Sequence, residues 1–142
     1  MTVSPGDVAP PFEQALRVGH ADIDELGHVN NVVYLRWVQD VAIAHWRALA
    51  TPAQQAAYAW VVMRHEIDYE AAGVEGDELV LRTWVGVASG ITFERHTEIV
   101  RAQDGRRLAR ARTLWCPVDA RTGRPCRVDR EVRARFSVPA PA

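Results

Sequence analysis

The sequence has no lysine and very little cysteine. All 17 basic side chains are arginines, and 18 acidic side chains leave a formal net charge of −1. This balance argues against a nucleic-acid partner, because nucleic-acid-binding domains normally present a basic face. The two cysteines, Cys116 and Cys126, match no zinc or redox motif and are too few for a disulfide scaffold.

Long apolar runs are also missing. No stretch approaches the ~18 apolar residues of a membrane span, and the N-terminus lacks the basic and then apolar pattern of a secretory signal. We therefore expect a soluble, cytoplasmic protein without a membrane partner. A chain of 142 residues has room for one core. We predict a single domain over 1–142, with the proline-containing segments 1–11 and 137–142 as loose termini.

One long helix is predicted from about Val32 to Ala50. Apolar side chains recur there at i, i+3, i+4 and i+7, and a second apolar strip adds to the first. The polar residues are confined to one narrow side, which is typical of a buried helix. Asn30 and Asn31 are both candidate N-caps.

Strands are predicted on both sides of this helix. A first strand is expected over Phe12–His20, and after Pro52 the sequence alternates with a period of two. The later strands are expected at about Trp60–Tyr69, Leu79–Val87, Ile91–Ile99 and Leu108–Val118.

The alternation also predicts which side chains share a face. In the second strand, one face should hold Val61, Met63, His65, Ile67 and Tyr69. In the fourth, one face should hold Ile91, Phe93, Thr97 and Ile99. Ser89-Gly90 and Asp104-Gly105 indicate hairpin turns. The fold class is therefore α+β, with an antiparallel five-stranded sheet wrapped around one long buried helix.

The segment from Asp22 to Tyr34 has the residue types that acyl-transfer chemistry needs. A helix N-terminus presents unpaired backbone N–H groups and the positive end of the helix dipole, which polarise a carbonyl oxygen. Asp24, just upstream, could attack a carbonyl or take a proton from water. A purely structural interpretation is also open, in which Asp22 and Asp24 stabilise a turn and Asn30 caps the helix. A metal site is conceivable from the ligand types of His20, Asp22, Asp24 and His28.

This segment resembles the motif of the hot-dog acyl-CoA thioesterases related to 4-hydroxybenzoyl-CoA thioesterase, and part of it is similar to plant acyl-carrier-protein thioesterases. The matching residues read Asp22-x-Asp24-x-x-Gly27-His28-Val29-Asn30-Asn31-x-x-Tyr34. Supporting similarity covers 64–69, 76–79 and 119–125. The resemblance implies a single hot-dog domain and hydrolysis of an acyl- or aroyl-CoA thioester, with coenzyme A as part of the substrate and neither cofactor nor metal.

The resemblance also implies site residues. Asp24 matches the nucleophile or general base, and Asn31 the position whose backbone amide binds the thioester carbonyl. Gly27 keeps the loop small, and His28 matches a histidine of the plant enzymes. Leu26 departs from the plant pattern, which has Asn there. Two side chains of the helix, Tyr34 and Trp37, are expected to line the acyl pocket.

Other interpretations remain open. A hot-dog hydratase or dehydratase, or a non-catalytic acyl-thioester-binding domain, would share the fold. Glu66 and Asp68 could supply a second carboxylate or be a solvated strand face. The cluster Arg121, Arg124, Arg127 and Arg130 could bind phosphates or be solvated. The sequence does not identify the acyl group or decide between coenzyme A and acyl carrier protein.

Assembly is predicted from one strand. The run Trp60–Tyr69 is long, β-rich and free of proline and glycine, so nothing in it prevents edge-to-edge pairing. Hot-dog relatives pair in this way, with active sites at the interface. We expect a homodimer or homotetramer.

Overall fold

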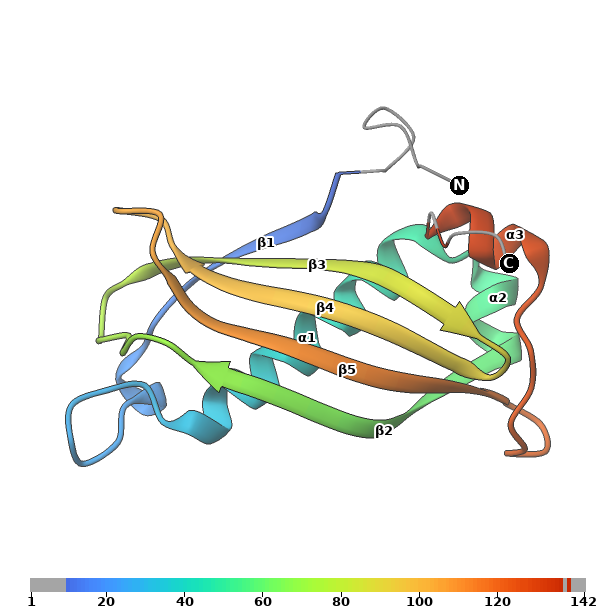
Figure 1. Ribbon diagram of the computed structural model, residues 1–142, viewed down its shortest axis with the longest axis horizontal. Helices are drawn as coiled ribbons and strands as arrows, with labels where there is room; N and C mark the ends of the chain where they lie inside the picture. The colour runs from blue at the N-terminus through green and yellow to red at the C-terminus, as the bar shows by residue number, and fades with distance from the viewer. Residues whose placement is uncertain (1–9, 137, 139–142) are drawn as a thin grey trace.

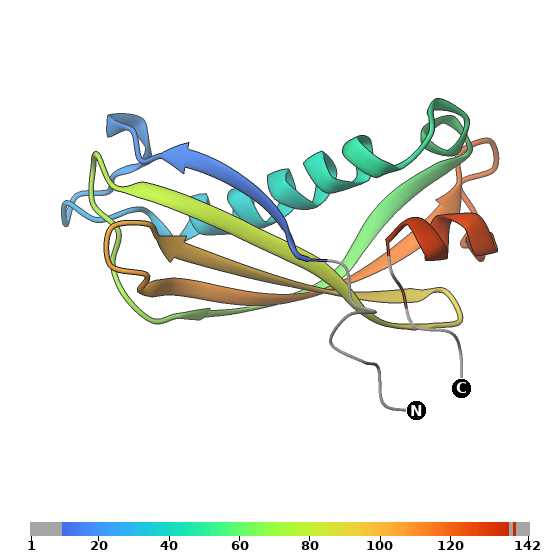
Figure 2. The same ribbon diagram turned by 90° about the horizontal axis from the view of Figure 1, so that it is seen from above.

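The structure, a computed structural model, describes residues 10–136 and Val138. One five-stranded antiparallel sheet lies against a long helix, α1 (Figure 1). Seen from above, the sheet curves around this helix, with β1 and β2 at its two sides (Figure 2). The strands are β1 (Phe12–Arg17), β2 (Tyr58–Tyr69), β3 (Glu78–Ser89), β4 (Thr92–Arg101) and β5 (Arg107–Asp119). The helices are η1 (His20–Asp22), α1 (Asn31–Leu49), α2 (Pro52–Ala57) and α3 (Arg130–Arg135).

Helix α1 begins where the asparagine pair predicts. Asn30 is the N-cap, and its side-chain oxygen accepts a hydrogen bond from the Val32 amide at 3.0 Å. The helix therefore starts at Asn31 and ends at Leu49, within one residue of the predicted bounds. Its buried face consists of Val33, Tyr34, Trp37, Val38, Val41, Ala42 and His45.

The sheet has the order β1-β3-β4-β5-β2, and every neighbouring pair is antiparallel. Both predicted hairpins are present, and each places a glycine at positive φ, Gly90 at 61° and Gly105 at 69°. The strand predicted to lie at an edge, β2, is at an edge.

A β-bulge in β2 makes one predicted face wrong. Val62 pairs with Trp115 and Arg64 with Leu114, so Met63 is an extra residue without a partner of its own. The bulge reverses the alternation: Val61 and Met63 are 51% and 58% exposed, although both were expected to share a face with His65 and Ile67. The exposed apolar side chains therefore lie at the middle of the edge strand.

Three short elements were not predicted: α2, η1 and α3. Period two was expected directly after Pro52, but α2 begins there, because Thr51 caps it and accepts from the Gln54 amide at 3.1 Å. The first strand ends at Arg17 rather than His20, and η1 follows. The expected loose termini lie largely outside the described residues. Val138 is an exception, since its amide donates to the Arg133 carbonyl at 2.9 Å.

The core has two parts along α1. One surrounds the N-terminal half of the helix and contains Tyr34, Trp37 and Leu81. The other surrounds its C-terminal end and contains Ala50, Phe93 and Phe136. A sheet wrapped in this way around one buried helix is the hot-dog arrangement that the sequence predicts. Within the described chain, no helix has the length and apolar character to span a membrane.

Tyr34 provides a test of the core. Its buried hydroxyl accepts a hydrogen bond from the Gly73 amide at 3.0 Å. Tyr34→Phe leaves this amide without a partner, so we expect a loss of about 1–3 kcal/mol in the free energy of unfolding. The control is Tyr69→Phe, which removes an exposed bond to the Asn31 carbonyl and should change stability by no more than about 0.5 kcal/mol. Urea denaturation measures the free energy of unfolding of both variants. Equal losses would contradict the stabilising role of the buried Tyr34 hydroxyl.

Candidate active site

The residues of the sequence motif form a tight turn before α1. The Asp24 amide donates to the His28 carbonyl at 2.8 Å, and the Gly27 amide donates to the Asp24 carbonyl at 3.1 Å. Gly27 has a φ of 79°, in the left-handed region that favours glycine. A β-bridge between Ile23 and Val29 closes the turn at its base. The backbone therefore fixes Asp24 beside the first turn of α1.

The two carboxylates of the motif have different environments. Asp22 is engaged on both oxygens: Oδ2 accepts from the Gly19 amide at 2.9 Å, and Oδ1 pairs with Arg36 at 3.1 Å. Asp24 Oδ1 accepts from the Leu26 amide at 2.9 Å and weakly from the His28 amide at 3.4 Å. Within residues 10–136 and Val138, Asp24 Oδ2 accepts no hydrogen bond.

Asp24 lies in an open depression at the end of α1. Because Oδ1 is held by the turn, the carboxylate is oriented while Oδ2 remains available to a substrate or a water. Carboxylate and loop backbone together form the depression, whose lining residues are His20, Ile23, Asp24, Glu25, Leu26 and Asn30.

Asn31 is the first residue of α1, so its backbone amide belongs to the turn whose N–H groups lack intrahelical partners. Its carbonyl accepts a hydrogen bond from the Tyr69 hydroxyl at 3.1 Å. The Asn31 and His28 side chains are exposed. The structure thus brings Asp24, Gly27, His28 and Asn31 together at the N-terminus of the helix.

Tyr34 and Trp37, predicted to line a substrate pocket, lie in the core instead. They are 2% and 5% exposed, and their rings meet edge to face at 5.6 Å. Burial raises the pKa of Tyr34. Neither residue lines the depression at Asp24.

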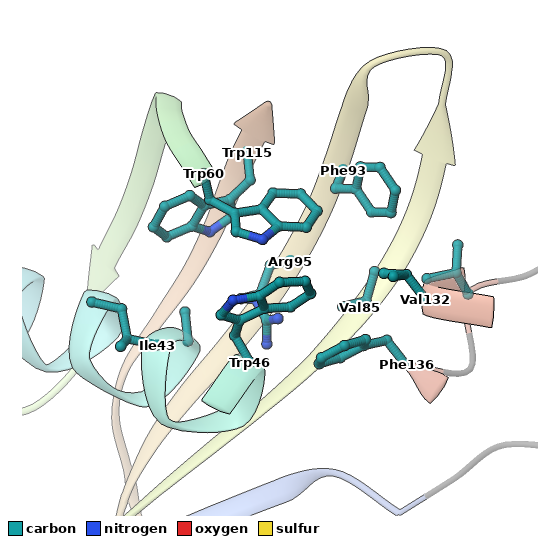
Figure 3. A pocket seen from close by; sticks show the side chains of 11 residues that line it. Ile43, Trp46, Trp60, Val85, Phe93, Arg95, Trp115, Val132 and Phe136 are labelled. Atoms are coloured by element: carbon teal, nitrogen blue, oxygen red, sulfur yellow. The ribbon is translucent and has the colours of Figure 1, made fainter. Parts of the chain in front are cut away.

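A cavity lies at the opposite end of α1 (Figure 3). It has a volume of about 70 Å³ and is lined by residues of α1, α3, four strands and the segment after α3. Its lining is apolar and aromatic except for Arg95, and consists of Ala42, Ile43, Trp46, Trp60, Val85, Phe93, Arg95, Trp115, Val132, Phe136 and Val138.

Arg95 is the residue that the sequence analysis missed. It is 7% exposed and lies on the inner face of β4, at the inward position between Phe93 and Thr97. The predicted inward face of β4 contained Ile91, Phe93, Thr97 and Ile99, and it omitted Arg95, which lies in the same alternating row. A charge in an otherwise inward-facing row is the signal that identifies it.

The remaining candidates lie away from Asp24. Asp68 pairs with Arg110 at 3.2 Å, and Glu66 with Arg64 and Arg112, so both carboxylates belong to the ion pairs of the outer sheet face. The loop that follows β5, which contains Arg121, Arg124 and Arg127, lies at the end of the molecule opposite the turn before α1 (Figure 1). In the described part of the chain, no group of three or more His, Cys, Asp or Glu side chains could hold a metal ion.

Comparisons with known structures identify the same fold. Slr0204, a 1,4-dihydroxy-2-naphthoyl-CoA thioesterase from Synechocystis, is 21% identical, with 89% of this chain and 95% of that chain covered and a TM-score of 0.75. SAV2348 from Staphylococcus aureus, solved in complex with CoA, is 12% identical, with 95% and 90% covered and a TM-score of 0.80.

The 12:0-ACP thioesterase from Umbellularia californica is 17% identical with a TM-score of 0.76. The match covers 92% of this chain but 51% of that one. At these identities the likeness concerns the fold. No curated protein matches the sequence at a significant level. The family profile of the thioesterase-like superfamily matches residues 18–136. The chain therefore belongs to the thioesterase-like superfamily, as the motif before α1 predicts.

Proposed function

We propose that this protein is an acyl-CoA thioesterase that hydrolyses the thioester to a free acid and coenzyme A. The proposal rests on one observation above all: Asp24 is held by its turn with one carboxylate oxygen available, beside the N-terminus of a buried helix. Membership of the thioesterase-like superfamily supports it, as does the likeness to SAV2348, which was solved in complex with CoA.

The proposed reaction uses only groups of this chain and water. The thioester carbonyl oxygen accepts a hydrogen bond from the Asn31 amide, which stabilises negative charge as the carbonyl carbon becomes tetrahedral. Asp24 either takes a proton from the attacking water or attacks the carbon itself, forming an anhydride that water then hydrolyses. The carbon–sulfur bond breaks, and the thiolate of coenzyme A takes up a proton. The reaction needs neither a metal nor a cofactor.

The active unit in this proposal is a dimer. The Tyr69 end of β2 contacts the start of α1 at Asn31, whereas Trp60 near the other end of β2 lines the aromatic cavity. If the β2 edges of two copies pair antiparallel about a two-fold axis, the cavity of one protomer lies beside the Asp24 turn of its partner. Within one chain, Trp46 is about 22 Å along α1 from Asn31. The exposed Val61 and Met63 occupy the middle of this edge.

Asp24→Asn should lower turnover of acyl-CoA thioesters by at least ~100-fold, because it removes the base or nucleophile. The fold should survive, since the amide oxygen can accept the bonds from Leu26 and His28. Glu25→Gln, which removes a neighbouring charge in the same depression, is the control and should stay near wild-type turnover. Release of free thiol measures both.

A folded Asp24→Asn protein with near-normal turnover would refute the proposal. The same preparations should be offered enoyl-CoA thioesters, because hydration of these without thiol release would identify the hydratase alternative instead.

The Asn31 amide can be removed without changing the helix. Proline is well tolerated at the first helical position, and Asn30, at φ −61° and ψ 134°, has the extended conformation that a following proline requires. Asn31→Pro should therefore fold and lose at least ~100-fold in kcat. Asn31→Ala, which keeps the amide, should retain its activity. Equal activity in the two variants would exclude this amide as the oxyanion donor.

Activity should depend on association through β2. Val61→Asp places a charge on the pairing edge and should give monomers in sedimentation, with a parallel loss of turnover. Val87→Asp alters a valine of β3 that is 64% exposed and should leave both unchanged. A dilution series of the wild type completes the test, and a fully active monomer would contradict the composite site.

A further inference from the structure

The aromatic cavity contains a buried cation whose known partners are neutral. Arg95 Nη1 donates to His45 Nδ1 at 2.9 Å and to Thr83 Oγ1 at 3.1 Å. Because arginine only donates, Nδ1 of His45 must be the acceptor. Burial and the nearby Arg95 charge lower the pKa of His45 to about 4, so the imidazole is neutral at pH 7.

In the part of the chain that the structure describes, Arg95 has the neutral partners His45 and Thr83 and forms no ion pair with an acidic side chain. None of the described residues that line the cavity is acidic. Burial lowers the pKa of Arg95 to about 10, so it is still protonated at neutral pH. A buried charge without a counter-charge is unfavourable, and proteins normally pair it.

Two further buried donors lack a partner in the described part of the chain. Trp60 Nε1 and Trp115 Nε1 are buried, and neither has a hydrogen-bond partner among the described residues. Both indoles line the cavity with Arg95, and in Figure 3 their nitrogens are on the ring edges on the side of Trp46. Buried donors are rarely left unpaired in native proteins. The described lining thus has three donor groups, on Arg95, Trp60 and Trp115, and no acidic side chain. This composition suits an anionic oxygen group.

The cavity volume indicates the size of the chemical group that fits inside it. A closed cavity of roughly 150 Å³ holds a benzene ring, whereas this cavity has about 70 Å³ and is open on one side. The terminal carboxylate of an acyl chain and its first methylene group fit that space. The rest of a straight acyl chain would extend along the apolar wall formed by Ile43 and Trp46.

We propose that this cavity binds the terminal carboxylate of a dicarboxylic acyl group, and that the preferred substrates are CoA thioesters of straight-chain dicarboxylic acids. This inference rests on the thioesterase function proposed above and names its substrate class. Arg95 forms the charged end of the acyl site, and the thioester at the other end of the chain reaches the Asp24 turn of the partner subunit.

The first test compares thioesters that differ only in the terminal group. The pairs are succinyl-CoA with butyryl-CoA, adipoyl-CoA with hexanoyl-CoA, and suberoyl-CoA with octanoyl-CoA. The wild type should prefer the dicarboxylic member in kcat/KM by at least ~10-fold for one or more lengths. Preference for the monocarboxylic member at every length would overturn the proposal.

Arg95→Met should lower this preference ratio by about 100-fold, the usual consequence of removing one partner of a buried charge pair. The neutral side chain has a similar length, so folding is expected to survive. The control is Arg112→Met on the outer face of β5, which pairs with Glu94 at 2.6 Å and should leave the ratio unchanged. If Arg95→Met lowers both substrates equally, Arg95 supports the fold only.

Binding by the wild type needs neither a variant nor turnover. Free adipate or suberate should raise the melting temperature more than hexanoate or octanoate at equal concentration. Stabilisation by dicarboxylates without thioester cleavage would keep the carboxylate site and reject the thioesterase proposal. Cleavage that depends on Asp24, without any preference for the dicarboxylic substrates, would keep the thioesterase proposal and reject the carboxylate site.

Discussion

The N-terminus of α1 is the feature on which the candidate site depends. Asn30 ends the loop by capping the helix through the Val32 amide, and the following residue presents a first-turn amide. The turn that holds Asp24 is tied to the same point, because the Asn30 amide donates to the Asp22 carbonyl at 2.9 Å. Carboxylate and helix dipole are therefore positioned together. Even the Asn31 carbonyl is fixed from the sheet side, by the Tyr69 hydroxyl.

The other end of α1 has the opposite character. There the helix covers an aromatic cavity whose described lining has one charged side chain, Arg95, which is held by two neutral partners. The two ends are joined by β2, which contacts Asn31 at one end and supplies Trp60 at the other. If this edge pairs antiparallel with its copy, as proposed above, the cavity of one protomer lies close to the Asp24 turn of the other. In the proposed dimer, one substrate spans a catalytic end and a binding end from different chains.

Much of this arrangement could be predicted from sequence because it is local. The helix bounds follow from the apolar period and the Asn30 cap, the hairpins follow from Ser89-Gly90 and Asp104-Gly105, and the Asp24 turn was identified by its motif. Which of two nearby carboxylates is available could not be read from spacing, because Arg36, fourteen residues away in the helix, engages Asp22. Dimerisation, the cytoplasmic location and the role of His28 stay predictions.

The misses arise from long-range contacts and from irregular geometry. The bulge at Met63 depends on how β2 meets β5, and a period-two pattern contains no sign of it. Tyr34 was predicted to line the acyl pocket, but its hydroxyl accepts a hydrogen bond from the Gly73 amide of a distant loop. Arg95 breaks the apolar row of β4, and its significance emerges only where His45, Thr83 and the tryptophans surround it.

The central claim is that Asp24 of one protomer and Arg95 of its partner serve the same substrate. Subunit mixing tests it most directly, with Asp24→Asn and Arg95→Met proteins that each have little activity on the preferred dicarboxylic thioester. In a mixed dimer both substitutions fall in one site and the other site is intact. After exchange of equal amounts, the account predicts recovery to about a quarter of wild-type kcat/KM. No recovery, in mixtures shown to contain mixed dimers, would contradict it.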